Sequence, residues 1–160
     1  MKIKMIAAVG KNLELGYKND LIWHFKEDMK FFKEQTLNHV VVMGDNTYLS
    51  LPKTLSNRTN IVLSKTRCDF PSDVILYNDI NLFLDDYKDK DIDIFVIGGA
   101  TIYKLFLKYA DELYLTEIDD TFKDATVYFP AFNKENYERE VLKTVKENDI
   151  TYKHVLYRRK

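Results

Sequence analysis

The sequence predicts an α/β fold whose central sheet is mostly parallel and carries antiparallel strands at its C-terminal end. Short apolar runs alternate with segments of helical periodicity over residues 3–118, as they do in strand–helix–strand units. Residues 137–157 differ, because two strand-like stretches follow one another there across a polar turn at 147–149. No repeat and no linker-like segment divides the 160 residues, so we expect one domain over 1–160.

Each expected strand is an apolar run that ends at glycine or at polar residues. The expected strands are 3–9, 39–43, 59–64, 73–76, 92–97, 112–118, 137–145 and 151–157. Helical spacing of apolar residues predicts helices at 26–35, 46–51 and 100–109, and a further helix that Asn78 or Asp79 begins. Residues 10–25 are expected to form a long loop, and such loops in compact domains usually serve as lids or binding loops.

The composition excludes several classes of function. A formal net charge of −1 provides no basic field to bind nucleic acid or an anionic membrane. The single cysteine, Cys68, excludes an internal disulfide, and no metal site is expected because His24, His39 and His154 lack paired-ligand spacing. We interpret these histidines as surface or lid residues. No apolar run has the length of a membrane span or a signal peptide, which predicts a cytoplasmic protein with a small molecule or protein as its partner.

Polar residues and glycines follow several strands at the edge where parallel sheets bind ligands. They are the loop 10–25 and the segments 44–47, 64–67 and 98–101. The pair Gly98-Gly99 lets backbone amides approach a phosphate at the start of the next helix, although glycines also serve turns there. The phosphate-binding lysine loop and the Gly-x-Gly-x-x-Gly fingerprint are absent, so neither a P-loop enzyme nor an ordinary Rossmann dehydrogenase is indicated.

Asp28 has two interpretations from the residues alone. It belongs to the first turn of the expected helix 26–35, where an acid suits the positive end of the helix. It also precedes Phe31 and Phe32 by three and four residues, which puts the carboxylate and the rings on one helix face. A carboxylate held against aromatic surface is partly desolvated, so its pKa rises and it can donate a proton or anchor a cationic heterocycle.

Motifs along essentially the whole chain resemble the dihydrofolate reductase family. In order, they are Ile6-Ala7-Ala8, Gly16-x-x-Asn19-x-Leu21-x-Trp23, Asp28-x-x-x-Phe32-x-x-x-Thr36-Leu37-Asn38, Val42-Met43-Gly44-x-x-Thr47-Tyr48, Leu55-x-x-Arg58-x-Asn60-x-Val62-Leu63-Ser64, Ile97-Gly98-Gly99-x-x-x-Tyr103, Leu113-Tyr114-Leu115-Thr116 and Phe129-Pro130. Each motif alone is unspecific, whereas their order and spacing together are highly specific. The resemblance implies a three-layer α/β/α fold with a C-terminal antiparallel hairpin.

The resemblance also implies an activity and the catalytic residues. Hydride passes from the nicotinamide of NADPH to 7,8-dihydrofolate, and the adjacent ring nitrogen takes up a proton. The product, 5,6,7,8-tetrahydrofolate, serves one-carbon metabolism. Asp28 is implied to be the only carboxylate in the pterin pocket and to promote protonation through water. Thr116 is implied to hydrogen-bond Asp28, and Trp23 to close over the site.

The implied substrate site combines apolar side chains with one arginine. Phe32, Leu51 and Leu55 are implied to sandwich the benzoyl ring, and Arg58 to bind the glutamate carboxylate through its planar donors. The implied substrate residues are Ile6, Ala7, Ala8, Leu21, Asp28, Met29, Phe32, Ser50, Leu51, Leu55, Arg58, Ile97, Tyr103 and Thr116.

The implied cofactor site lies at the strand ends. Family members usually have a cis peptide between the residues that match Gly98 and Gly99, beside the pyrophosphate, and Tyr103 is implied to lie beside the nicotinamide. The implied cofactor residues are Ala8, Leu15, Gly16, Asn19, Asp20, Leu21, Gly44, Asp45, Asn46, Thr47, Leu63, Ser64, Lys65, Thr66, Ile97, Gly98, Gly99, Ala100, Thr101, Ile102, Tyr103 and Thr126.

The chain departs from the family pattern at the lid and at the cofactor phosphate. Ile22 and Lys26 stand where proline is usual, which predicts a less pre-organised lid. Asp45 stands where arginine or lysine usually binds the 2′-phosphate, and a carboxylate repels that phosphate by about 1 kcal/mol or more. Residues 65–67 could supply the phosphate site instead, or Asp45 could favour NADH by binding a free 2′-hydroxyl.

Two rival functions stay open at this point. One is a reductase of another heterocycle on the same fold, such as the pyrimidine reductase of riboflavin synthesis. The other is a non-catalytic pterin or nucleotide binder. Asp28, Phe32 and Arg58 together favour folate, and Asp28 with Trp23 favours catalysis. The expected partners are therefore dihydrofolate, NADPH and antifolates such as trimethoprim-like diaminopyrimidines, bound by a bacterial-type monomer.

Overall fold

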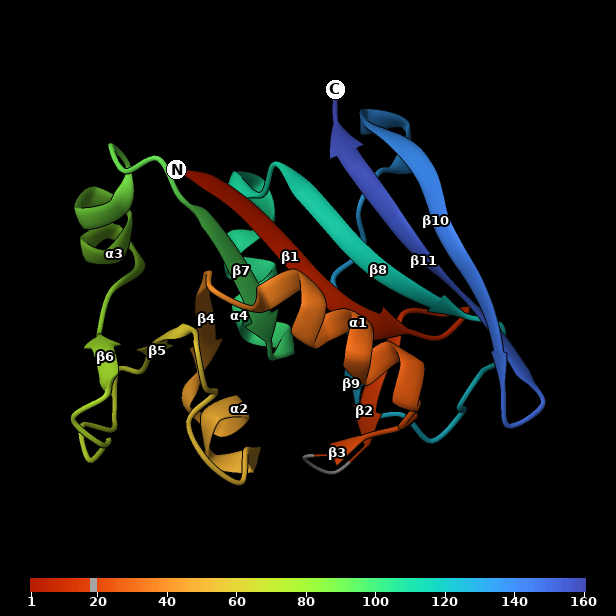
Figure 1. The fold of residues 1–160 in the computed structure, drawn as a ribbon, viewed down its shortest axis with the longest axis horizontal. Coiled ribbons are helices and arrows are strands. Elements are labelled where there is room, and N and C mark those ends of the chain that lie inside the picture. Colours follow the sequence, from red (N-terminus) through yellow and green to blue (C-terminus); the bar gives the residue numbers. More distant parts are fainter. Residues whose placement is uncertain (18–19) are drawn as a thin grey trace.

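A computed structural model describes residues 1–17 and 20–160 and contains an eight-stranded sheet. The strand order is β10-β11-β8-β1-β7-β4-β5-β6 (Figure 1). The bounds are β1 Lys2–Val9, β4 Val40–Gly44, β5 Thr59–Leu63, β6 Val74–Tyr77, β7 Asp93–Gly98, β8 Glu112–Ile118, β10 Tyr137–Glu147 and β11 Ile150–Arg159. Neighbours from β8 to β6 run parallel, whereas β11 is antiparallel to both β8 and β10. The predicted α/β class with its antiparallel C-terminal hairpin is confirmed.

Helices cover both faces of this sheet (Figure 1). They are α1 Lys26–Thr36, α2 Asp45–Ser50, α3 Ile80–Tyr87 and α4 Ala100–Phe106, with the short 3-10 helices η1 Leu107–Tyr109 and η2 Lys134–Asn136. Consecutive strand residues face opposite sides of a sheet, so the buried run 40–43 needs apolar cover on both. Phe31 of α1 packs in the cluster that contains Val41, while Phe83 and Phe106 pack in the cluster that contains Val42. Helices packed on both faces of the sheet give the predicted three-layer α/β/α arrangement.

Two helix predictions gain detail from the structure. Asp79, rather than Asn78, caps α3, because its side chain accepts a hydrogen bond of 2.7 Å from the backbone N–H of Asn81. The helix expected over 100–109 is α-helical only to Phe106 and continues as the 3-10 helix η1.

The prediction that residues 10–25 form a loop throughout is wrong, because this segment contains strands. Strand β2 (Glu14–Tyr17) pairs with β3 (Asp20–Leu21) and with β9 (Val127–Tyr128) in a second, three-stranded sheet. The buried carboxylate of Glu14 accepts hydrogen bonds of 2.7 Å from the N–H groups of Asn12 and Phe122. Strands this short carry almost no periodicity and pair with a distant segment, so the local pattern could not reveal them.

The carboxyl ends of three central strands meet at one edge of the main sheet. Gly44 at the end of β4 pairs with Leu63 at the end of β5, and Met43 pairs with Gly98 at the end of β7. Helices α2 and α4 begin directly after β4 and at the second residue after β7. The topology therefore brings the predicted ligand-binding segments 44–47, 64–67 and 98–101 to the same edge.

Candidate active site

A chain of hydrogen bonds joins Asp28 of α1 to the main sheet. Thr116 lies in β8 and faces His154 of β11 in the strand register. Thr116 Oγ1 donates to Asp28 Oδ1 at 2.6 Å and lies 2.9 Å from His154 Nδ1. A threonine hydroxyl has one proton, so when that proton is given to Asp28 the His154 Nδ1–H must donate to Thr116. Three elements thus hold one carboxylate in a defined orientation.

The surroundings of this chain shift two pKa values. Burial raises the pKa of the Asp28 carboxyl above its usual range, the Thr116 hydroxyl opposes the rise, and the charge of Glu147 adds to it. His154 is 1% exposed, and burial lowers its pKa to about 4. His154 is therefore neutral at neutral pH, and its 3.7 Å approach to Asp28 is not an ion pair there. The interpretation of His154 as a surface or lid residue is wrong.

A different carboxylate caps the helix on which Asp28 lies. Glu147, at the end of β10, accepts hydrogen bonds from the backbone N–H groups of Lys26 at 2.7 Å and Glu27 at 3.2 Å. Phe25 occupies the N-cap position and makes no side-chain hydrogen bond to the helix. Because Asp28 contacts β8 instead, the structure favours the interpretation of Asp28 as a partly desolvated carboxylate over that of a helix cap.

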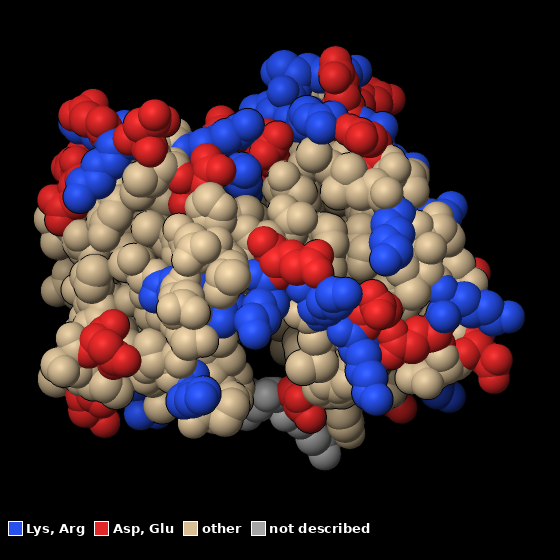
Figure 2. Space-filling view, in the orientation of Figure 1, with Lys and Arg blue, Asp and Glu red and all other residues tan. Residues whose placement is uncertain are grey.

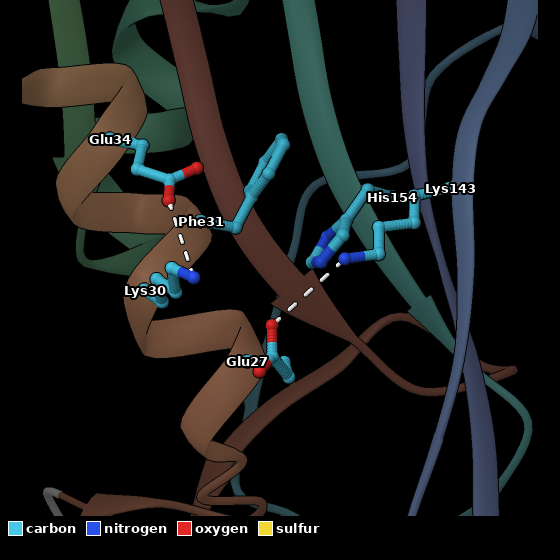
Figure 3. A pocket seen from close by; sticks show the side chains of 6 residues that line it. All are labelled: Glu27, Lys30, Phe31, Glu34, Lys143 and His154. Atoms are coloured by element: carbon cyan, nitrogen blue, oxygen red, sulfur yellow. Dashed lines mark ion pairs between the residues drawn. The ribbon is translucent and has the colours of Figure 1, made fainter.

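The Phe31 ring and a small cleft lie next to His154, the last residue in the series of hydrogen bonds from Asp28. The rings of Phe31 and His154 stack with 3.9 Å between centroids and 8° between planes. Both rings line a cleft of about 70 Å³ between α1 and the C-terminal hairpin (Figure 3). Figure 3 also shows Lys143 of β10 reaching toward Glu27, with 4.0 Å between Nζ and Oε2. The start of α1 is thus connected to both hairpin strands.

Most of the predicted substrate residues lie on the sheet face that α1 covers. One apolar cluster contains Ile6, Phe32, Leu51, Leu55 and Ile97. Met29 and Leu21 are 64% and 59% exposed and are therefore open to a ligand. The Ser50 hydroxyl donates to the Thr47 carbonyl at 2.6 Å. The structure does not bring the other predicted residues into this cluster: Ala7 and Tyr103 pack on the opposite face, and Ala8 packs beside Phe25.

Arg58 is held beside this cluster by a buried asparagine. Arg58 Nε donates to the Ser56 carbonyl at 2.9 Å, and Nη1 donates to Thr36 Oγ1 at 3.2 Å. Asn60 is 1% exposed and donates from Nδ2 to the carbonyls of Leu55 at 2.8 Å and Arg58 at 3.0 Å. The role of Asn60 was not predicted from the sequence. The signal was a lone amide within an apolar strand, because a buried amide needs hydrogen-bond partners.

The surface on this side of the molecule is hollowed between α2 and α1 (Figure 2). Basic side chains gather at the upper rim of the hollow in that view. Burial lowers the pKa of Arg58 from its usual value, but an arginine remains charged at neutral pH. The hollow is therefore suited to a ligand with an apolar body and an anionic end.

Trp23 connects the lid segment to a loop that sequence analysis did not single out. Its Nε1–H donates to Asp120 Oδ2 at 3.1 Å, across 97 residues of sequence. The indole packs beside the cluster formed by Phe25, Ile118 and Tyr152. A surface-type aspartate after a strand gave no signal of this contact, so Asp120 could not be found from the local pattern.

Backbone rather than side chains forms the cofactor edge at Gly98 and Gly99. The peptide between them is cis, as the resemblance implies. Gly98 has φ +123°, where a side chain would be strained, and a Cβ there would lie 3.4 Å from the ring of Tyr103. A Cβ at Gly44 would lie 3.0 Å from Cγ1 of Ile102. The glycines at these strand ends therefore allow a close approach that other residues would block.

Asp45, the first residue of α2, is tied to the end of β5. Ser64 Oγ donates to Asp45 Oδ2 at 2.7 Å, and the backbone N–H of Arg67 donates to Ser64 Oγ at 3.0 Å. A groove of about 1120 Å³ begins here. Its lining includes the predicted cofactor residues Leu63, Ser64, Lys65, Thr101 and Ile102.

The remaining predicted cofactor residues lie in the small sheet or at helix starts. The N–H of Thr126 donates to the Gly16 carbonyl at 3.0 Å, which joins the segment before β9 to β2. Leu15 is buried in β2, and Asp20 is exposed in β3. Asn46 and Thr47 belong to α2, Ala100 begins α4, and Thr66 is exposed after β5. Asn19 lies outside the described residues.

Within residues 1–17 and 20–160, no group of three or more His, Cys, Asp or Glu side chains could hold a metal ion. In the same part of the chain, every helix is too short or too polar to cross a membrane. Every buried side-chain nitrogen or oxygen described has a hydrogen-bond partner.

Comparison with known proteins shows what the chain is similar to. A family model described as dihydrofolate reductase matches residues 2–159. A dihydrofolate reductase of Buchnera aphidicola subsp. Acyrthosiphon pisum (strain APS) is 42% identical over 82% of this chain and 81% of that protein. Dihydrofolate reductase type 9 of Escherichia coli is 36% identical over 91% and 86% of the two chains. The dihydrofolate reductase of Bacillus subtilis (strain 168) is 32% identical over 99% and 95%.

Proposed function

Because the chain belongs to the dihydrofolate reductase family, we propose that Asp28 is the carboxylate that binds the pterin and promotes its protonation. The enzyme reduces 7,8-dihydrofolate to 5,6,7,8-tetrahydrofolate. NADPH, when bound, supplies the hydride. Since hydride and proton come from different donors, one carboxylate suffices.

The observation that carries this role is the setting of Asp28. Burial raises the pKa of its carboxyl, so it holds a proton at a higher pH than an exposed aspartate does. The hydrogen bond of 2.6 Å from Thr116 restricts the carboxylate to one orientation, which favours a planar pair of contacts with a heterocycle. Trp23, bound to Asp120, is proposed to close the lid over the pterin and to retain the water through which the proton passes.

The remainder of the substrate is proposed to lie in the hollow between α1 and α2. Phe32, Leu51 and Leu55 belong to one apolar cluster, which supports a contact with the benzoyl ring. Arg58 is proposed to bind the glutamate carboxylate, because hydrogen bonds to Ser56 and Thr36 already restrict its guanidinium and little side-chain freedom would be lost.

The cofactor is proposed to lie along the strand-end edge. The residues present fit a dinucleotide, because Gly98 and Gly99 lack side chains that would keep a pyrophosphate away from the backbone. The adjoining groove of about 1120 Å³ provides room for the adenosine half. Asp45 and Ser64 are proposed to face the ribose 2′ position, with Lys65 supplying a positive charge toward a 2′-phosphate.

The proposal extends to the organisation of the enzyme. Residues 1–160 are proposed to form one catalytic domain that acts as a monomer in the cytoplasm. Strands from both ends of the chain support the single domain, since β1 and β11 both pair with β8. Asp28 would also pair with a cationic diaminopyrimidine, so antifolates of that class are proposed to compete with dihydrofolate.

The proposed role of Asp28 is tested by following NADPH oxidation with dihydrofolate. Wild-type enzyme is expected to turn over, and Asp28→Asn to lower kcat/KM by about 10²–10⁴, the usual contribution of an acid–base group. Glu27→Gln is the matched control on the same helical turn and is expected to stay within about threefold of wild type. An Asp28→Asn enzyme as active as this control would refute the role.

A further inference from the structure

We propose that Glu147 is a positioning residue that holds the start of α1, and with it Asp28, against the sheet. The inference rests on the proposed role of Asp28 and concerns what keeps that carboxylate in place. It assigns a part in substrate binding to the C-terminal hairpin, whose turn begins just after Glu147.

The first N–H groups of a helix have no partners within the helix and need acceptors from elsewhere. In α1 the N-cap residue Phe25 has no side-chain acceptor. Glu147 fills this need from the hairpin, because Oε2 accepts from Lys26 N at 2.7 Å and Oε1 accepts from Glu27 N at 3.2 Å. The acceptor is separated from these donors by 121 and 120 residues of sequence, so it is a tertiary contact and not a local cap.

Glu147 is itself held in place by a buried tyrosine. The hydroxyl of Tyr152 donates to Glu147 Oε1 at 2.9 Å, and Tyr152 is 0% exposed. The same ring stacks on Phe25, with 4.6 Å between centroids and 21° between planes. The hairpin therefore contacts the N-cap residue by stacking and the next two residues by hydrogen bonds, which restrains the first turn of α1 as a unit.

The charges around this contact connect it to Asp28. Partial burial acts to raise the pKa of Glu147, but the donors Lys26 N–H, Tyr152 hydroxyl and Glu27 N–H hold it below its usual range, so Glu147 is ionised. Its negative charge favours the protonated form of Asp28. The other groups that face Asp28 are Thr116 of β8 and His154 and Tyr152 of β11. On the same helix as Asp28, the charge of Glu27 is opposed by Lys143 of β10.

This contact also bears on the missing proline at the helix start. A proline at position 26 would have no N–H to give to Glu147. The backbone would nevertheless accept one, because Lys26 is the first helical residue and Phe25 is extended, with φ −111° and ψ 131°, as the residue before proline must be. At the start of α1 the chain thus has a hydrogen bond from the Lys26 N–H to the distant Glu147 carboxylate. A proline ring at position 26 could have restricted the same backbone instead.

The test compares Glu147→Ala, Glu147→Gln and Lys26→Pro with the double variant Glu147→Ala/Lys26→Pro. Glu138→Ala, a change of an exposed glutamate on the same strand, is the matched control. Three readouts are taken: kcat and KM for dihydrofolate, the pH profile of kcat/KM, and hydrogen exchange of the amides of residues 26 and 27. The exchange measurement needs no turnover, so it can be read even if the proposed function fails.

Glu147→Ala is expected to raise KM for dihydrofolate about three- to tenfold with a smaller change in kcat, and to speed exchange of both amides. In the Lys26→Pro background the same substitution is expected to change KM less than about twofold, because one of the two donors is gone. Glu147→Gln keeps one acceptor oxygen but loses the charge and turns an NH2 group toward one of the backbone N–H donors. KM is therefore expected to rise less than in Glu147→Ala, and the pKa that Asp28 contributes to the profile is expected to move to lower pH.

Equal effects of Glu147→Ala with and without Lys26→Pro would overturn the proposal. So would unchanged amide exchange in Glu147→Ala, or an equal rise in KM in Glu138→Ala. Absence of dihydrofolate turnover in the wild type would refute the proposed function instead, with the exchange result still deciding whether Glu147 holds the helix.

Discussion

Two carboxylates of the proposed site, Asp28 and Asp45, have the same local arrangement. Each lies in the first turn of a helix, α1 or α2, and each accepts a hydrogen bond from a hydroxyl, at 2.6 Å from Thr116 and 2.7 Å from Ser64. In each case the hydroxyl also has a second hydrogen-bonding neighbour at 2.9 or 3.0 Å. An acid in the first turn of a helix that accepts a hydrogen bond from a hydroxyl is therefore not enough to identify a catalytic carboxylate.

The difference lies in what surrounds the two pairs. Behind Thr116 is the titratable ring of His154, buried and stacked on Phe31, whereas behind Ser64 is a backbone N–H of an exposed turn. Burial raises the pKa of Asp28, the property a proton-handling group requires. Chemistry at this site is therefore set by packing from distant strands rather than by the local motif.

The two pairs are expected to differ most when the hydroxyl of each is removed. Thr116→Val leaves Asp28 without its donor in a partly desolvated site, which is expected to lower kcat/KM for dihydrofolate roughly tenfold to a hundredfold, since bonds to charged groups contribute about 1.5–3 kcal/mol. The pKa of Asp28 is expected to rise further, because the Thr116 hydroxyl acts to lower it. Steady-state kinetics over pH measure both effects.

Ser64→Ala is the matched change on the other pair. It is expected to alter KM for NADPH by less than about threefold, because the N–H groups and solvent near the exposed turn can replace the lost donor. Equal losses from Thr116→Val and Ser64→Ala would break the distinction drawn between the two carboxylates.

A smaller effect is expected from reversing the charge of Asp45. Asp45→Arg replaces a repulsion of about 1 kcal/mol with an attraction, so the Kd of NADPH is expected to fall about fivefold or more while that of NADH changes little. Titration of nicotinamide fluorescence at low and high salt measures this, and the gain should shrink at high salt. An unchanged Kd for NADPH would mean that Asp45 does not face the 2′-phosphate.

The fold was predictable because its signals are local. Apolar runs such as 40–43 and 94–96 indicate the buried strands of a parallel sheet that is covered on both faces. Glycines at the ends of these strands indicate the edge at which such sheets bind ligands. Asp28, Thr116 and Gly98 could be proposed as site residues because they stand in ordered motifs along the chain. The strands need only neighbouring residues to be recognised, whereas the site residues need the order and spacing of the motifs along the whole chain.

The parts that escaped prediction depend on contacts between distant segments. Glu147 reaches Lys26 across 121 residues, and Asp120 reaches Trp23 across 97. His154 lies between Lys153 and Val155 in the sequence, and only the register against β8 places it beside Thr116. Contacts between residues so far apart leave no periodic pattern in a single sequence. The partners can therefore be identified only from the assembled sheet.

Whether Asp28 assists proton uptake by the substrate is measured by the pH dependence of the activity loss in Asp28→Asn. At low pH the solvent can protonate the substrate without help, so the ratio of wild-type to variant kcat/KM should fall by at least about tenfold between about pH 8 and about pH 5.5. A large ratio that stays constant over this range would show that Asp28 only binds the pterin and does not assist its protonation.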